Sequence, residues 1–155
     1  MTDRFHLAQA NIARMRAPQD DPVMAGFVRR IEALNALADA APGFVWRLDT
    51  DDGTTTSPSA FDDELTLFNL SVWESIEALK DYVYRSNHVA AVQKRSEWFE
   101  RPGNSPLVLW WIEAGSIPTE AEALQRFALL WENGPSAKAF TFRKRFKHGG
   151  EDGIQ

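Results

Sequence analysis

Four residues of this sequence carry side chains that could act on a small molecule: Asn11, Asn69, Trp73 and His88. A carboxamide can orient a carbonyl group or dioxygen, an indole can stack on a flat ring, and an imidazole can act as a base or bind a metal ion. We expect Asn69 and His88 to be catalytic and Asn11 and Trp73 to contact a ligand. The alternative is structural, with the amides satisfying buried backbone groups, Trp73 in the core and His88 near the surface.

A helix through residues 88–99 would place His88 and Arg95 on one stripe with Val92 and Phe99. An anionic or carbonyl-bearing ligand could use that imidazole and guanidinium together. The alternative is that Arg95 lies at the surface and pairs with a nearby carboxylate. The predicted ligand contacts other than Asn11 and Trp73 are Trp46, Tyr84, Arg95 and Trp98.

The sequence gives no support for a metal site or a cofactor. It contains no Cys and three His, and these His residues form no HxH, HxxxH or EF-hand pattern. The acidic stretches 49–52 and 62–64 are typical of solvated loops. Glycine-rich nucleotide loops and the GxSxG motif of serine hydrolases are also missing from the sequence. We therefore expect no metal and no cofactor.

Composition favours one globular domain. The chain has 155 residues, 44% of them hydrophobic, with ten Phe and six Trp, which is enough for a substantial core. The net charge of -5 gives no electrostatic reason for nucleic-acid binding, and the basic cluster 143–147 is typical of a solvated strand edge. No signal peptide or membrane-spanning run is evident, so we expect a cytoplasmic location. We assign residues 1–147 to the domain and 148–155 to a polar tail.

The spacing of hydrophobic residues, together with residues that begin or end helices, predicts an α+β fold. Asp21 and Pro22 begin a helix that Pro42 and Gly43 end, and Thr119 with Glu122 begins another that stops at Gly134. Two more helices are expected, one from Ser75 to about Ser86 and one from there to Phe99. The predicted strands cover 5–13, 44–50, 65–72, 106–113 and 140–146. The order is βαββαβ, a ferredoxin-like arrangement, followed by an appended C-terminal helix and strand.

The predicted sheet has two distinct faces. On the third strand we expect Phe68, Leu70 and Val72 to face the helices, and Asn69, Ser71 and Trp73 to face the other way. A second copy of the sheet would bury that other face, which predicts a homodimer. The run LVLWWI in 106–113 is apolar on both faces, so this strand should be central or covered on both sides.

The segment NLSVWESIEALKDYVYRSNH, residues 69–88, resembles the strand-to-helix signature of the dimeric α+β barrel superfamily, which includes antibiotic-biosynthesis and haem-degrading monooxygenases. Over residues 5–143 the chain is similar to a bacterial family of unknown function in that superfamily. The stretches that carry this similarity are LAQANIARMRAP, DDPVMAGFV, PGFVWRL, VLWWIEAG and AFTFR. The resemblance implies the ferredoxin-like fold and a homodimer that forms a barrel.

The resemblance leaves several functions open. The haem-degrading enzymes have their functional Trp and axial His at positions that align near Tyr82 and Val92, so their motif is not matched here. The main hypothesis is a protein that binds a small apolar or aromatic molecule, with cofactor-independent monooxygenase activity as its enzymatic form. The alternatives are a non-catalytic ligand-binding or structural dimer and, further off, a haem-binding protein. A cavity lined by polar groups that satisfy one another would favour binding over catalysis.

Overall fold

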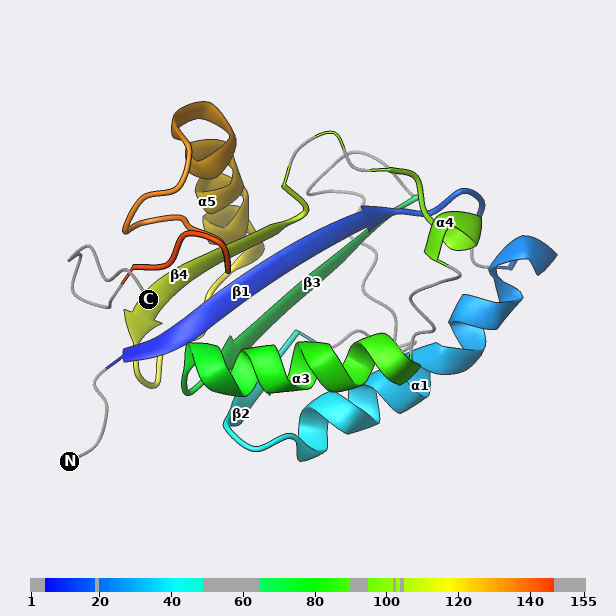
Figure 1. Cartoon of the computed structure of the whole chain (residues 1–155), viewed down its shortest axis with the longest axis horizontal. Helices are drawn as coiled ribbons and strands as arrows, with labels where there is room; N and C mark the ends of the chain where they lie inside the picture. The colour runs from blue at the N-terminus through cyan, green and yellow to red at the C-terminus, as the bar shows by residue number, and fades with distance from the viewer. Residues whose placement is uncertain are drawn as a thin grey trace.

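The structure is a computed structural model that describes residues 5–18, 20–48, 65–89, 95–101, 103 and 105–146. Its named elements are β1 (Phe5–Arg14), η1 (Pro22–Met24), α1 (Ala25–Ala40), β2 (Phe44–Arg47), β3 (Thr66–Trp73), α3 (Ile76–Val89), α4 (Arg95–Trp98), β4 (Leu107–Glu113) and α5 (Glu120–Asn133) (Figure 1). Among the described helices, none combines the length and apolarity that crossing a bilayer requires.

The four strands form one antiparallel sheet in the order β2-β3-β1-β4. This is the strand order of the ferredoxin-like fold, so the predicted βαββαβ arrangement is confirmed. The two central strands, β1 and β3, pair over their length, with Gln9 opposite Ser71 and Asn11 opposite Asn69. Polar side chains of the two strands therefore lie next to one another on the same face of the sheet.

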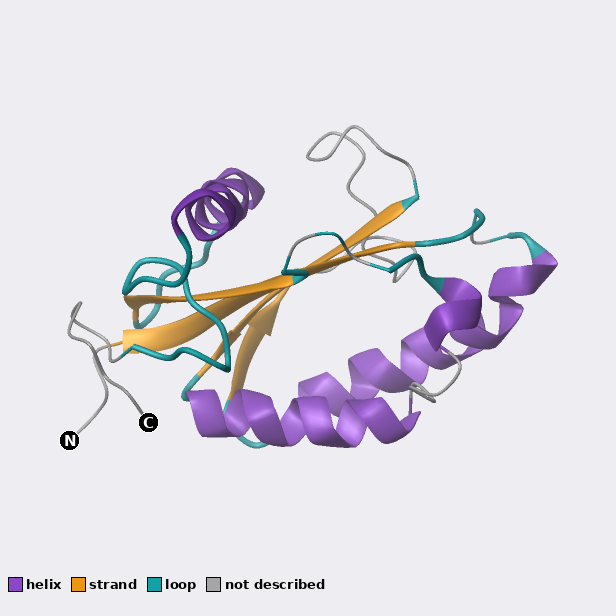
Figure 2. Cartoon of the chain, turned by 45° about the horizontal axis from the view of Figure 1, so that its top comes forward, coloured by secondary structure: helices purple, strands orange, loops and turns teal. Residues whose placement is uncertain are grey.

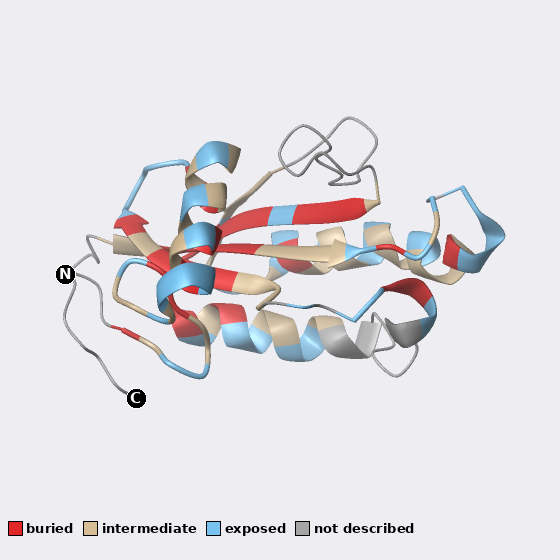
Figure 3. Ribbon diagram, turned by 90° about the horizontal axis from the view of Figure 1, so that it is seen from above, coloured by how far each residue is buried: buried red, intermediate tan, exposed pale blue. Residues whose placement is uncertain are grey.

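Helices lie on both faces of the sheet (Figure 2). On one face α5 packs through Phe127 and Leu130 against alternate residues of β1, β3 and β4. On the other face lie α1 and α3, and Trp73 of β3 stacks on Tyr82 of α3 with 5.1 Å between ring centroids. Buried residues are concentrated along the strands between these layers (Figure 3).

The predicted orientation of β3 is the reverse of the observed one. Phe68, Leu70 and Val72 pack in the cluster beneath α5, whereas Asn69, Ser71 and Trp73 lie on the face toward α1 and α3. Strand periodicity separates two sets of side chains but does not say which set each helix covers. Phe68, Leu70 and Val72 pack beneath α5, a helix later in the sequence, and the other set of side chains faces α1 and α3.

The connection from α1 to β2 brings the chain close to α3. Gly43 has a φ of 81°, and a Cβ placed on it would lie 2.5 Å from the Cβ of Ala78. Its carbonyl oxygen accepts a hydrogen bond of 2.8 Å from the backbone N–H of Glu74. Glycine is thus required here both by the left-handed backbone and by the close approach of the two segments.

The predicted pair of helices after β3 differs in its boundaries from the observed pair. The helix α3 continues to Val89, and α4 is a separate turn of four residues. Val92 of the proposed stripe lies outside the described residues. The end of α4 is joined to the residues that follow β1, because the carbonyl oxygen of Trp98 accepts a backbone hydrogen bond of 2.8 Å from Arg16 and Phe99 forms a β-bridge with Met15.

The C-terminal elements cover β4, which lies at the edge of the sheet and is packed on both faces. The predicted α5 begins as expected, with the Thr119 hydroxyl accepting from Glu122 N, and ends at Gly134. The predicted strand 140–146 is reduced to one isolated bridge between Phe140 and Leu109. After Phe140 the chain turns, and the Thr141 N–H donates to the Lys144 carbonyl. This hydrogen bond satisfies the two backbone groups without pairing to a neighbouring strand.

Candidate functional site

A cavity of about 380 Å³ lies between the sheet and the helices α1 and α3. β1 and β3 form one side of it, through the face that carries Asn11, Asn69 and Ser71. The opposite side is made largely by apolar side chains of the two helices, such as Leu34 and Val83. This volume is in the range of sites that hold a small organic molecule.

Aromatic groups lie at both ends of the cavity. At one end Trp73 packs between Phe44 and Tyr82, with centroid distances of 5.4 Å and 5.1 Å. At the other end the ring of Phe27 lies 5.9 Å from that of Trp98 and 4.9 Å from that of Phe99. The Phe44–Trp73 and Phe27–Phe99 pairs are edge to face, Trp73 and Tyr82 are stacked, and such packed rings give rigid apolar walls.

A chain of polar side chains runs along β1 and β3 between these ends, and we call it the polar ladder: Asn69, Asn11, Gln9, Ser71 and the indole of Trp73. The Asn69 amide donates to Asn11 Oδ1 at 3.3 Å, and the Asn11 amide donates to Gln9 Oε1 at 3.0 Å. Gln9 Nε2 donates to Ser71 Oγ at 2.7 Å. Trp73 Nε1 donates to the same oxygen at 2.8 Å.

Burial increases along the polar ladder. Asn69 is exposed and Asn11 is half-buried, whereas Gln9, Ser71 and Trp73 are 5%, 8% and 1% exposed. Burying a polar group without a partner is costly, so the mutual hydrogen bonds are what allows Gln9 and Ser71 to lie in the interior. The ladder is uncharged, and it leads from solvent to the buried end of the cavity.

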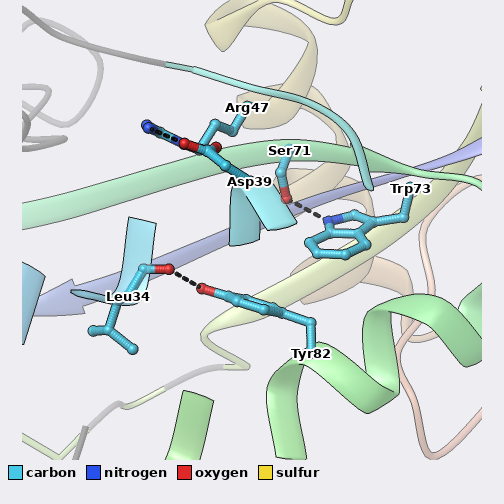
Figure 4. A network of polar contacts seen from close by, with 6 residues as sticks. All are labelled: Leu34, Asp39, Arg47, Ser71, Trp73 and Tyr82. Atoms are coloured by element: carbon cyan, nitrogen blue, oxygen red, sulfur yellow. Dashed lines mark hydrogen bonds and ion pairs between the residues drawn. The ribbon is translucent and has the colours of Figure 1, made fainter. Parts of the chain in front are cut away.

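An ion pair lies near this end of the cavity (Figure 4). Arg47, at the end of β2, donates from Nε to Asp39 Oδ1 at 2.8 Å and from a second nitrogen to Oδ2 at 3.2 Å. These hydrogen bonds lower the pKa of the Asp39 carboxyl below its usual value. The Arg47 side chain is 20% exposed and lines the cavity, and Asp39, at 52% exposed, holds its guanidinium in one orientation.

Tyr82 adds a second ionisable group to the cavity. Its hydroxyl donates to the carbonyl oxygen of Leu34 at 3.3 Å and so ties α3 to α1 (Figure 4). Burial raises the pKa of this phenol, with a smaller opposing effect from Arg47. Tyr82 is therefore protonated at neutral pH and acts as a hydrogen-bond donor.

Some predicted site residues line the cavity and others do not. Those that line it are Asn11, Asn69, Trp73 and Trp98. Trp46 packs with the cluster on the opposite face of the sheet, and Tyr84 is 66% exposed on the outside of α3. The side chains of His88 and Arg95 lie outside the part of the chain that the structure describes.

Gln9, Ser71, Arg47 and Tyr82 are site residues that the sequence did not single out. For the first two a pattern exists: Gln9 lies two residues before Asn11, and Ser71 two residues after Asn69, so each shares a strand face with a predicted residue. Their hydrogen bond depends on strand register, which the sequence leaves open. Arg47 and Tyr82 have no comparable pattern, because their places depend on how β2 and α3 pack.

The chemistry available among the described lining residues is binding and orientation. Arg47 and Tyr82 are the ionisable ones among them, and neither a carboxylate nor an imidazole is part of that set. Within the same part of the chain, His, Asp and Glu residues form no cluster of three that could hold a metal ion. The site can therefore hold a flat apolar molecule and offer it the neutral groups of the polar ladder beside the Arg47 guanidinium.

Solved structures of low sequence identity resemble the chain. PA3566 from Pseudomonas aeruginosa gives a TM-score of 0.49 at 11% identity, covering 75% of this chain and 99% of that one. SnoaB, a cofactor-independent oxygenase from Streptomyces nogalater, gives 0.42 at 13% identity, covering 72% and 95%. The NE2512 protein of unknown function from Nitrosomonas europaea gives 0.43 at 14% identity, covering 75% and 97%. These TM-scores are low, so the similarities assign no activity to this chain.

Sequence comparison gives a family. No curated protein matches the chain. One family model matches residues 6–154, which is nearly the whole length, and its description is a domain of unknown function, DUF3291. The chain therefore belongs to the DUF3291 family.

Proposed function

We propose that this protein binds a small, flat and mainly apolar molecule in the cavity between the sheet and α1 and α3. The observation that carries the proposal is the cavity itself, a partly open space of about 380 Å³ that is lined by aromatic and aliphatic side chains and, on one side, by the polar ladder. Apolar pockets with a few fixed polar groups are the usual form of small-molecule sites. The indole of Trp98 and the ring of Tyr82 offer surfaces for an aromatic ligand.

The polar ladder favours binding over turnover. Its side chains are paired with one another, so none of them is held as a free general acid or base. The described lining residues add Arg47, already bound by Asp39, and a protonated Tyr82. A cofactor-independent monooxygenase would need a group that takes a proton from its substrate, and the sequence offers His88 for that role. Binding is the function that the described geometry supports best.

The test is equilibrium dialysis with fluorene, a flat three-ring hydrocarbon, against the wild-type protein and a variant with a smaller cavity. Ala38 of α1 is buried and lines the cavity, so Ala38→Leu should fill part of it and weaken fluorene binding about tenfold or more. Ala36→Leu makes the same change at an exposed position of the same helix and should leave binding unchanged.

Two results would contradict the proposal. One is an absence of fluorene binding to the folded wild-type protein. The other is equal loss of binding in Ala38→Leu and Ala36→Leu, since the cavity would then not be the binding place. Saturable binding that only Ala38→Leu weakens supports the proposed function.

We also propose that two copies of the chain associate through the sheet face opposite the cavity. On that face Ile12, Trp46 and Leu48 are half-buried and pack on the edge of the cluster that α5 covers. The helix α5 makes its contacts with the sheet mainly at β4, which leaves Trp46 and Leu48 on the side of β2, and Ile12 toward the end of β1, at the margin of the cluster. A second sheet packed there would remove the group from water.

A further inference from the structure

We infer that Ser71 is the ligand-recognition residue of the cavity and that its hydroxyl donates a hydrogen bond to a carbonyl oxygen of the bound molecule. The inference rests on the proposed function and makes it more specific. It assigns the ligand to a chemical class, flat apolar compounds that carry a hydrogen-bond acceptor such as a ketone.

The hydrogen bonds of Ser71 carry the inference. A hydroxyl oxygen has two lone pairs and one hydrogen. In Ser71 both lone pairs accept hydrogen bonds, one from Gln9 Nε2 at 2.7 Å and one from Trp73 Nε1 at 2.8 Å. No acceptor for the remaining hydrogen is found among the described residues. Ser71 is 8% exposed and lines the cavity, so a molecule bound in the cavity can supply the acceptor for that hydrogen.

The two donors to Ser71 are themselves fixed. An indole nitrogen can only donate, and the Trp73 ring is held between Phe44 and Tyr82. Gln9 is 5% exposed, and its amide oxygen accepts from Asn11. Ser71 is therefore oriented before a ligand arrives, and a preorganised donor loses little entropy on binding. If the oxygen and nitrogen of the Gln9 amide exchanged places, Ser71 would donate its hydrogen to the Gln9 oxygen. A ligand carbonyl would then gain no hydrogen bond from Ser71. This arrangement is the alternative that the binding experiment must distinguish.

The same geometry predicts selectivity against donors. Because both lone pairs of Ser71 are occupied, an N–H group placed beside it would lose its water without gaining a partner. Three compounds of similar shape separate the cases: 9-fluorenone has a carbonyl at its central position, fluorene a methylene and carbazole an N–H. We expect 9-fluorenone to bind about tenfold more tightly than fluorene, with carbazole no tighter than fluorene.

The variants assign that preference to Ser71. Ser71→Ala should remove the tenfold preference for 9-fluorenone while fluorene still binds, and Ser71→Thr, which keeps the hydroxyl, should retain it. Ser116→Ala is the matched control, because Ser116 is exposed and is not among the described residues that line the cavity. Its affinities should equal those of the wild type for all three compounds.

Equilibrium dialysis gives the affinities, and the indole resonance of Trp73 in a ¹H–¹⁵N spectrum verifies that each variant is folded. If fluorene and 9-fluorenone bind the wild type equally, the inference is overturned while the cavity stands as a binding site. An unchanged preference in Ser71→Ala would overturn it as well. If none of the compounds binds, the proposed function fails, and the inference with it. Should Ser71→Ala not fold, the wild-type comparison and Ser71→Thr still decide the matter.

Discussion

The two tyrosines of the chain show how differently one side chain can be used two residues apart on the same helix. Tyr82 points into the cavity, where it stacks on Trp73 and donates to the Leu34 carbonyl. Tyr84 is 66% exposed. A helix turns by about 100° per residue, so positions two apart point in nearly opposite directions. This places Tyr82 in the site and Tyr84, which was a predicted ligand contact, away from it.

Burial of Tyr82 makes stability depend on pH in the alkaline range. Its pKa in the folded protein is raised above the usual 10.0, so the folded state keeps the phenol proton at a pH where the unfolded chain releases it. The free energy of unfolding should therefore fall as pH rises above about 10, by about 1.4 kcal/mol for each unit of pKa difference. Below that pH the contribution of Tyr82 to the free energy of unfolding does not change with pH.

Urea unfolding at pH 8 and at pH 10.5 measures this dependence. Other groups titrate in the same range, so the informative quantity is the difference between variants. Tyr82→Phe should show a smaller loss of stability between the two pH values than the wild type, whereas Tyr84→Phe should show the wild-type loss. Equal losses in all three proteins would mean that Tyr82 is not the group responsible.

The close contact between the start of β2 and α3 gives a prediction at the level of elements. Gly43→Ala should destabilise the protein in two ways, through the positive φ of 81° and through the 2.5 Å approach of the new Cβ to Ala78. Gly115 is the matched control, because its φ is 94° but nothing lies within 4 Å of a Cβ placed there. Gly115→Ala should cost about 1 to 2 kcal/mol for the backbone alone.

We expect Gly43→Ala to cost at least about 1 kcal/mol more than Gly115→Ala in the free energy of unfolding, since β2 and α3 must separate to admit the methyl group. Chemical denaturation of both variants measures the difference. Equal costs would show that the α1–β2 connection can move away from α3 without loss.

The sequence predicted the elements well and their relative placement less well. Local chemistry determines the caps of α5 at Thr119 and Gly134, so the boundaries of that helix followed from the sequence. The same holds for Asp21, whose side chain accepts from Val23 N at the start of η1. The orientation of β3 was wrong, because it depends on which helix packs on which face of the sheet. That choice is made by contacts between distant parts of the chain.

The candidate site shows the same limit. Asn11, Asn69 and Trp73 were chosen for their chemistry, and the structure brings them together on one face, although not the face expected. Gln9 and Ser71 complete the polar ladder, and they were missed because their bond joins residues 62 apart in sequence. Register between β1 and β3 creates that pair, and a single sequence carries little information on register.

At the scale of the whole molecule, the sheet separates two surfaces with different proposed roles. Figure 2 shows α1 and α3 on one side of the sheet and α5 on the other. The cavity lies on the side of α1 and α3, and the apolar group of Ile12, Trp46 and Leu48 packs against the cluster that α5 covers. If these roles are independent, a change on the α5 side can abolish self-association without affecting the ligand. Trp46 is suited to the test, since it is the largest of the three and lies on the short strand β2.

Native mass spectrometry of the wild type should show a species at twice the 17.5 kDa chain mass, and Trp46→Ala should shift it to the single-chain mass because the sheet-to-sheet contact loses its largest apolar group. Val45→Ala, at the adjacent and 38% exposed position of β2, should still give a species at twice the chain mass. Fluorene should bind Trp46→Ala as it binds the wild type, since the sheet lies between the two sites. A single-chain mass for the wild type would contradict the proposed pairing, and joint loss of pairing and ligand binding would show that the cavity depends on the second copy.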